Sequence, residues 1–274
     1  MKDFSFFAVK EFNEVSTQNE IHLEELQLAG YTIVENVLDE EELNEMRLKL
    51  DTIYEQQVDE LGNEYLLEKI NDSNFARCLL AYDEVFLTKI AANKRVLRII
   101  KQVLGDCFTL MLQNGILNKP SQQKIQNACA YHRDLNYQHF TSSRPLSVSA
   151  LFCIDDFSEE TGGTCILPYT HKIEKCPSPH FIEKNEKVVT AKAGSVLIFD
   201  SMMYHRAGRN TSKNVRRAIN NMYVLPFLKQ QISFPSILKG KYADNKFYKQ
   251  LLGYDSEPAC DVTCFRKKRI LRVP

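Results

Sequence analysis

The second half of the chain contains a series of short β-rich segments with no helical pattern between them. Pro, Gly, Asn and Ser residues separate the segments, as is typical of turns. Parallel strands need long crossovers, usually helical, so this pattern argues against a βαβ fold and favours a sandwich or barrel. The segments are residues 108–117, 146–154, 163–168, 187–191, 195–200 and 218–227.

The first half has the spacing of amphipathic helices. Residues 21–29 end at Gly30, a natural helix stop, and residues 31–38 then have the pattern of a strand. Asp39 and Glu42 form a capping box that predicts a helix over 40–60, and Asn93 is placed to cap another that ends before Gly105. We expect one domain, with a helical part at about 1–105, a β core at about 106–230 and a C-terminal extension over 231–274.

Charge and composition exclude several classes of function. Lys plus Arg and Asp plus Glu number 35 each, so the chain has no global field that would attract nucleic acid or an anionic membrane. The basic sequence FRKKRILR near the C-terminus is interpreted as a solvated tail. No apolar run approaches the roughly 18 residues of a membrane helix. The N-terminus does not resemble a secretory signal, and the scattered cysteines favour free thiols in a cytoplasmic protein.

Residues 131–139, YHRDLNYQH, resemble the catalytic loop of a protein kinase. In that loop HRDL is followed by three residues and an Asn that binds magnesium, but here the last position is His139. The chain also lacks a glycine-rich phosphate loop, a VAIK-type strand lysine and a DFG site. The kinase hypothesis is therefore rejected.

The same stretch suits a metal site. On a strand, residues i and i+2 point to the same side, so His132 and Asp134 would present an imidazole and a carboxylate together. Two histidines and one carboxylate form the facial triad of non-heme Fe(II) oxygenases. His205, after the apolar run 195–200, is the best candidate for the second histidine. The competing candidates are His139, His171 and His180.

Two arginines, Arg216 and Arg217, follow His205 in the sequence and are candidates to bind a carboxylate. An oxygenase that uses 2-oxoglutarate must bind the distal carboxylate of that molecule, and Arg is the bidentate partner for a carboxylate. Arg216 lies 11 residues after His205, which leaves room for a turn and a return on the neighbouring antiparallel strand. Strand alternation allows only one of Arg216 and Arg217 to point inward. Both would lie at the surface if the strand were a solvent-facing edge.

Four stretches of the sequence, taken together, resemble the phytanoyl-CoA dioxygenase family of Fe(II)- and 2-oxoglutarate-dependent oxygenases. The stretches are LAGYTIVENVLDEEELNEMR, HRD at 132–134, IDDFSEETGGTCILPYTHK and GSVLIFDSMMYHRAGRNTSKNVRRAINNMY. The resemblance implies a mainly β fold, a double-stranded β-helix (jelly-roll, cupin-like) core with buttressing N-terminal helices. It also implies Fe(II), 2-oxoglutarate and O2 as cofactor and co-substrates, with His132, Asp134 and His205 as metal ligands and Arg216 as the 2-oxoglutarate anchor.

The expected reaction follows from the resemblance. It is the hydroxylation of an unactivated C–H bond of a small molecule, a metabolite or biosynthetic intermediate, with release of succinate and CO2. Relatives that halogenate replace the carboxylate ligand with a small residue, so Asp134 favours hydroxylation or a related oxidation. Two alternatives stay open: a non-catalytic jelly-roll protein that binds a metal for structure or sensing, and a zinc or manganese hydrolase or isomerase.

Departures from the family pattern leave some contacts to be assigned. Ala207 stands where a serine often follows the second histidine, so Gln113 and Asn118 are predicted to help bind 2-oxoglutarate. Arg133 and Asn136 are candidates for substrate contact or for loop hydrogen bonding. Gly162 and Gly163 are assigned to a tight turn. Loops over 119–130, 135–145 and 227–235, or the C-terminal tail, are expected to hold the substrate. The oligomeric state is not predicted.

Overall fold

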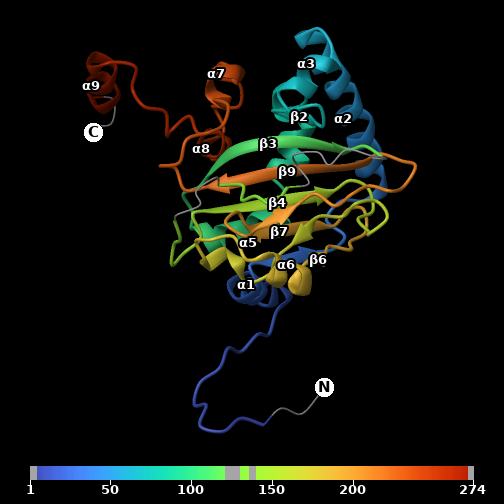
Figure 1. Cartoon of the computed structure of the whole chain (residues 1–274). Coiled ribbons are helices and arrows are strands. Elements are labelled where there is room, and N and C mark those ends of the chain that lie inside the picture. Colours follow the sequence, from blue (N-terminus) through green and yellow to red (C-terminus); the bar gives the residue numbers. More distant parts are fainter. Residues whose placement is uncertain (1–4, 121–129, 136–139, 271–274) are drawn as a thin grey trace.

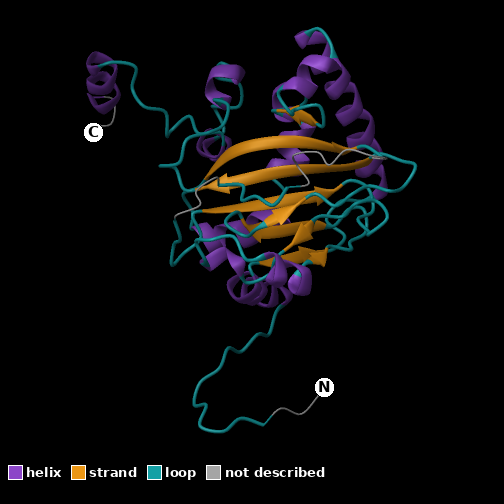
Figure 2. Ribbon diagram, viewed as in Figure 1, coloured by secondary structure: helices purple, strands orange, loops and turns teal. Residues whose placement is uncertain are grey.

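The centre of the molecule is a six-stranded antiparallel sheet (Figures 1 and 2). The computed structural model describes residues 5–120, 130–135 and 140–270. The strand order does not follow the sequence, because neighbours such as β4 and β9 come from distant parts of the chain. The strands, in spatial order, are β1 (Tyr31–Val34), β7 (Val196–Asp200), β4 (Ser147–Cys153), β9 (Arg216–Val224), β3 (Thr109–Asn118) and β2 (Phe75–Arg77).

A smaller sheet covers one face of the larger one. Its three strands are β6 (Lys187–Val188), β5 (Cys165–Ile166) and β8 (His205–Arg206), and a bridge between His132 and His205 extends it. Apolar side chains from both sheets, including Leu151, Ile166 and Leu197, form one buried cluster between them. The predicted two-sheet architecture is confirmed.

Helices pack against the other face of the six-stranded sheet. These are α1 (Gln18–Ala29), α2 (Glu40–Leu61) and α5 (Lys94–Leu104), and each contributes to a large core with the helix-facing residues of the strands. The predicted capping box of Asp39 and Glu42 is present at the start of α2. The stripe of Leu43, Met46 and Leu50 is buried against the sheet, as expected of an amphipathic helix.

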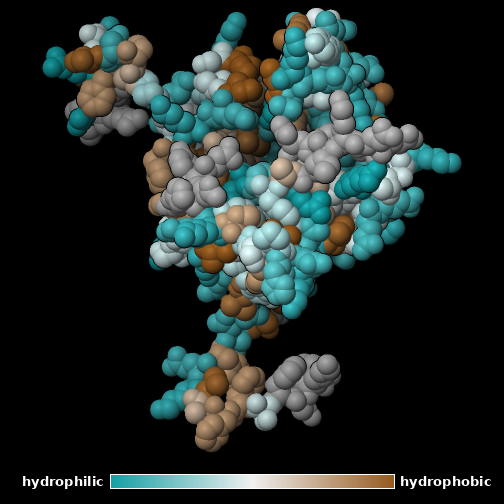
Figure 3. Space-filling model, in the orientation of Figure 1, coloured by the Kyte–Doolittle hydropathy of each residue, from teal (hydrophilic) through white to brown (hydrophobic). Residues whose placement is uncertain are grey.

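Shorter elements complete the described part of the chain. The helices α7 and α8 add Phe234, Leu238 and Leu251 to the large core, while α9 and the N-terminal segment extend from the body (Figures 1 and 3). The single-domain assignment stays a prediction, which this shared core supports. The elements are α3 (Glu64–Lys69), α4 (Leu79–Tyr82), η1 (Phe86–Ala91), η3 (Thr170–Lys172), α6 (Pro179–Asn185), α7 (Phe234–Leu238), α8 (Lys246–Leu251) and α9 (Val262–Ile270).

Two general properties complete this description. Among the described residues, no helix combines the length and the apolar character that crossing a membrane requires. The cysteines in the same ranges are all free thiols, which include Cys260 just before α9 and Cys264 within it.

Candidate metal centre

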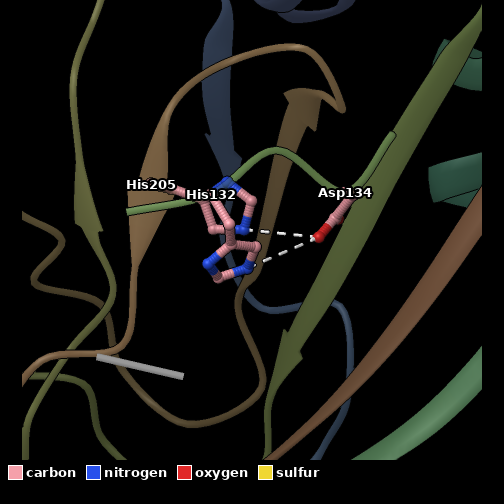
Figure 4. Close-up of side chains that lie close together, drawn as sticks. All are labelled: His132, Asp134 and His205. Atoms are coloured by element: carbon pink, nitrogen blue, oxygen red, sulfur yellow. Dashed lines mark ion pairs between the residues drawn. The ribbon is translucent and has the colours of Figure 1, made fainter. Parts of the chain in front are cut away.

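His132, Asp134 and His205 lie together at the edge of the smaller sheet (Figure 4). The backbone N–H of His132 donates to the carbonyl of His205 at 2.9 Å, and the reverse bond is 3.0 Å. The Asp134 N–H donates to the Ser201 carbonyl at 3.0 Å. Asp134 Oδ1 lies 3.4 Å from His205 Nε2 and 3.9 Å from His132 Nε2, and the three possible ligand atoms are all within 4.8 Å of one another.

The local backbone differs in one respect from the predicted strand. Only His132 forms a β-bridge, and Asp134 already lies in a bend. Its carboxylate reaches the histidines because the Ser201 carbonyl holds its N–H in place. The three side chains converge, although a regular strand does not position all of them.

Both imidazoles are oriented by a backbone carbonyl. The Nδ1 atom of His132 lies 2.9 Å from the Ala130 carbonyl, and that of His205 lies 3.0 Å from the Met203 carbonyl. A carbonyl only accepts hydrogen bonds, so each Nδ1 carries a proton, and in the neutral ring each Nε2 keeps a lone pair. Both lone pairs are therefore available on the side of Asp134, as a metal ligand requires.

The Asp134 carboxylate is oriented from the larger sheet. Its Oδ2 accepts hydrogen bonds from Ser149 Oγ of β4 and, at 3.4 Å, from Asn220 Nδ2 of β9. Ser149 is in turn hydrogen-bonded to Ser201 at 2.9 Å. Oδ2 is thereby occupied, and Oδ1 faces the histidines.

Electrostatic interactions favour the protonation states that a metal needs at Asp134 and His132, but not at His205. Burial opposes ionisation of Asp134, but the charge and hydrogen bond of His205 hold the pKa of that carboxyl well below its usual value. Burial and the neighbouring His205 lower the pKa of His132. Burial also disfavours the charged form of His205, but Asp134 outweighs it and raises the pKa. The cluster therefore presents an ionised carboxylate beside a His132 ring that favours the neutral form.

A pocket of about 260 Å³ opens onto this cluster, and Arg216 lies in its wall. Arg216 is buried; its Nη2 donates to the Gly162 carbonyl at 2.8 Å, and its guanidinium lies 4.3 Å from the centre of the Phe157 ring. Arg217 points to the other face of the sheet, where it forms ion pairs with Asp51 and Asp155. As expected, only one of the two arginines points inward.

The return strand after His205 lies in a different place from the one predicted. His205 is on β8 of the smaller sheet, whereas Arg216 begins β9 of the larger sheet, so these strands are not neighbours. The connection between them crosses from one sheet to the other. This crossing brings Arg216 to the pocket from the sheet opposite His205.

The two residues predicted to help bind 2-oxoglutarate do not line the pocket. Gln113 faces the helices, where its side chain accepts from the Leu80 N–H and donates to the Phe86 carbonyl, both at 2.8 Å. The prediction for Gln113 is therefore corrected: alternation along β3 turns it away from the metal cluster. Asn118 faces the smaller sheet but bonds the carbonyls of Gly162 and Gly208. It joins two loops, which positions the turn beside Arg216.

The turn at Gly162 and Gly163 is as close-packed as its sequence suggests. Gly162 has a φ of 71°, and a Cβ there would lie 2.6 Å from the Gly208 carbonyl oxygen. A Cβ on Gly208 would lie 2.2 Å from the Gly163 carbonyl oxygen. Glycine is therefore needed where these two loops meet.

Four further side chains at the pocket were not identified from the sequence. Alternation could have found Asn114 and Asn220, because they share a sheet face with Asn118 and Arg216 respectively. The residues are Asn114, Ser149, Thr164 and Asn220; Asn114, Thr164 and Asn220 line the pocket, and Ser149 holds Asp134.

The remaining candidates have other positions. Arg133 is buried with its guanidinium 4.2 Å from the centre of the Tyr204 ring. His171 is buried on the helical side of the six-stranded sheet, and His180 is exposed on α6. Asn136, His139 and most of the loop 119–130 lie outside the described residues, as does part of the loop 135–145. Ala207 lines the pocket.

Comparison with known proteins identifies the family. Residues 26–218 match the family model described as phytanoyl-CoA dioxygenase (PhyH). The chain belongs to the phytanoyl-CoA dioxygenase family. An uncharacterized protein of Mycobacterium tuberculosis is 34% identical over 230 residues, which cover 80% of this chain and 82% of that protein. The dioxygenase cdmD of Talaromyces verruculosus is 22% identical over 213 residues, covering 69% and 68%.

Solved structures show the same fold. The epimerase SnoN from nogalamycin biosynthesis, described as non-heme and alpha-ketoglutarate-dependent, superposes with a TM-score of 0.58 at 17% identity, covering 76% of this chain and 81% of its own. A complex of SnoN with Fe³⁺, alpha-ketoglutarate and nogalamycin RO gives 0.57 at 15% identity, covering 76% and 84%. The predicted jelly-roll fold and family are confirmed. Membership of this family supports the predicted use of iron, 2-oxoglutarate and O2, and the His-Asp-His cluster offers the donors that iron requires.

Proposed function

We propose that the protein is an Fe(II)- and 2-oxoglutarate-dependent dioxygenase that hydroxylates an unactivated C–H bond of a small molecule and releases succinate and CO2. The observation that supports this most directly is the arrangement of the pocket. Two imidazole Nε2 atoms and one carboxylate oxygen converge at this pocket, and a buried arginine lines it from the opposite sheet. Each group required by this chemistry is present, and the donors are of the type that Fe(II) accepts.

When bound, iron together with 2-oxoglutarate and O2 would supply the oxidising power for the reaction. The residues of the chain hold and orient the reactants. His132, Asp134 and His205 would hold the metal through two imidazole nitrogens and one carboxylate oxygen. Arg216 would bind the distal carboxylate of 2-oxoglutarate through two hydrogen bonds, as a guanidinium does with a carboxylate.

The walls of the pocket would exclude water from the reacting centre. Leu112, Ile116, Leu151 and Phe199 form an apolar lining. Ser149 and Asn220 keep Asp134 Oδ2 occupied, so that Oδ1 stays directed at the metal. Asp134 also occupies the position that must be vacated for a halide, which supports oxidation rather than halogenation.

The substrate is proposed to be a small polar metabolite or a biosynthetic intermediate. Arg77, Asn114 and Gln231 line the same pocket as the metal cluster and offer hydrogen bonds beside the apolar wall. Arg77 is already paired with Asp72. Its charge is therefore compensated, and a polyanionic substrate is not required.

The test is a measurement of succinate formed from 2-oxoglutarate by the Fe(II)-loaded protein, with O2 and a library of small metabolites. Succinate formation that depends on iron and O2 and stops in Asp134→Ala supports the proposal. A protein that binds iron but never consumes 2-oxoglutarate would instead be a metal-binding or sensing protein. Turnover with zinc or manganese, without O2, would identify a hydrolase or isomerase.

A further inference from the structure

A second cavity lies on the opposite side of the six-stranded sheet from the metal centre. It has a volume of about 380 Å³ and is enclosed by α1, the end of α5, the outer face of β4 and β7, and the segment 142–145. Figure 1 shows α1 and α5 packed on this side of the sheet. The cavity does not share any of its lining residues with the metal pocket.

The rim of this second cavity is positively charged. Arg144 and Lys172 both line it, and neither has an acidic ion-pair partner among the described residues. The Lys172 Nζ donates to the Gln27 carbonyl at 3.1 Å, which places the ammonium at the C-terminal end of α1. Two cations beside one concave surface favour an anionic ligand.

Two polar side chains inside the cavity have unused hydrogen-bonding capacity. His171 is only 5% exposed, and neither of its ring nitrogens makes a hydrogen bond of ordinary geometry, although the Gln27 carbonyl is near enough to influence the ring. Asp200 is also buried; its Oδ1 accepts from the Met202 N–H at 2.9 Å. Its Oδ2 makes no hydrogen bond within the described residues. Buried polar atoms in native proteins usually have partners, so the two ring nitrogens of His171 indicate a bound polar molecule.

The chemistry of the lining defines the ligand further. Leu23, Leu26, Val103 and Val148 form an apolar wall, which suits a hydrocarbon side chain. The cations suit a carboxylate. Asp200 would repel a ligand that only accepts hydrogen bonds, so the ligand must also carry a donor near its carboxylate. These requirements are met together by a 2-hydroxy or 2-amino acid with an apolar side chain.

We infer that this second cavity is a binding site for a small 2-hydroxy or 2-amino acid with an apolar side chain, held by Arg144, Lys172, His171 and Asp200. The carboxylate lies between Arg144 and Lys172, the hydroxyl or ammonium group donates to Asp200, and the side chain packs on α1 and α5. The site does not depend on the proposed oxygenase activity.

The test is calorimetric titration of the full-length protein with 2-hydroxy-4-methylpentanoate. EDTA is present so that the acid cannot chelate a metal. Lys172→Gln and Arg144→Gln are each expected to weaken binding about tenfold or more, because each removes a charge-assisted hydrogen bond. Both residues are exposed, so the folded structure should persist. Lys184→Gln removes the same charge from exposed α6 and should leave the affinity unchanged.

Two comparisons test the assigned class of ligand. We expect 4-methylpentanoate, which lacks only the hydroxyl group, to bind about tenfold more weakly than the hydroxy acid. This difference should disappear in Asp200→Asn, which keeps an acceptor for Met202 but loses the acceptor for the ligand. Inorganic phosphate should bind more weakly still. Absence of binding by the hydroxy acid, equal affinities of the three probes, or unchanged binding in Lys172→Gln and Arg144→Gln would overturn the inference.

Discussion

The two faces of the six-stranded sheet have different roles around β4 and β9, although the same strands supply both. Toward the helices, Val148, Phe152 and Ile219 are buried in the large apolar core. Toward the smaller sheet, their neighbours Ser149 and Asn220 hold the Asp134 carboxylate. Because side chains alternate along each strand, a residue that packs in the large core is followed by one that faces the metal ligands. Substitutions of adjacent residues can therefore test the two roles separately.

The largest expected effect is the loss of the metal. Asp134→Ala and His205→Ala each remove one of three ligands, so iron binding and 2-oxoglutarate turnover should fall to background. The variants should stay folded, because the metal cluster lies outside the large apolar core. Iron affinity is measured by titration under anaerobic conditions, and folding by circular dichroism. Asp156→Ala, at an exposed carboxylate, is the control. Normal iron binding in both ligand variants would contradict the assignment of the triad.

Adjacent substitutions on β9 should separate the two faces directly. Ile219→Ala should lower the free energy of unfolding by about 2–5 kcal/mol, as expected when a buried aliphatic side chain is truncated. Asn220→Ala should change that free energy by less than about 1 kcal/mol but reduce metal affinity or turnover by about 10–100-fold. Urea unfolding and single-turnover kinetics measure the two effects. The comparison fails if both variants lose stability equally and keep full activity.

Arg216 and Arg217, which are adjacent at the start of β9, provide a test with a smaller expected effect. Arg216→Lys should raise the KM for 2-oxoglutarate by about 10–100-fold, because lysine cannot form the bidentate contact. Arg217→Lys should leave this KM within about twofold, since Arg217 faces Asp51 and Asp155 on the other side. Initial rates at varied 2-oxoglutarate concentration distinguish the two. A larger KM effect in the Arg217 variant would place the co-substrate elsewhere.

The smallest expected effect is a pH-dependent change in folding stability at Asp200, on the helical side of the six-stranded sheet. Burial raises the pKa of Asp200 to about 6, above the value of about 3.9 expected in the unfolded chain. Between these values the folded state binds more protons, so stability falls as pH rises. Asp200→Asn removes this dependence and should gain up to about 2 kcal/mol relative to the wild type between pH 4 and pH 7.

Urea unfolding without added ligand, at several pH values, measures this difference. Asp156→Asn is the matched control, because the hydrogen bond from Lys192 lowers the pKa of Asp156. The wild type should therefore gain stability relative to that variant as pH rises, which is the opposite sign. A flat difference between the wild type and Asp200→Asn would mean that Asp200 is solvated.

Local patterns in the sequence predicted much of the fold. The capping box at Asp39 and the short β-rich segments rely on neighbours within a few residues, and both were found where expected. The elements between residues 64 and 91 were not predicted, because they are short and depend on packing against the sheet. Two-residue strands such as β8 are likewise stabilised by their partners rather than by their own composition.

The candidate site was predicted in part, and the failures have a physical cause. His132, Asp134, His205 and Arg216 were identified because their chemistry restricts the choice of residue type and spacing. Gln113 and Asn118 differ by an odd number of positions, so a regular strand cannot turn both to the same face. Register in β3 also shifts between Leu110 and Leu112, which cannot be read from the sequence. Ser149 was missed because only the fold brings it to Asp134.

The mutual backbone hydrogen bonds of His132 and His205 tie two metal ligands to one small piece of sheet. The imidazoles cannot separate unless the segment 130–135 detaches from β8, and detachment would also move Asp134. Opening of the metal site and local unfolding of this segment should therefore be the same event. Bound iron is then expected to slow hydrogen–deuterium exchange at the amides of His132, Asp134 and His205, while leaving the amides of the helical layer nearly unaffected.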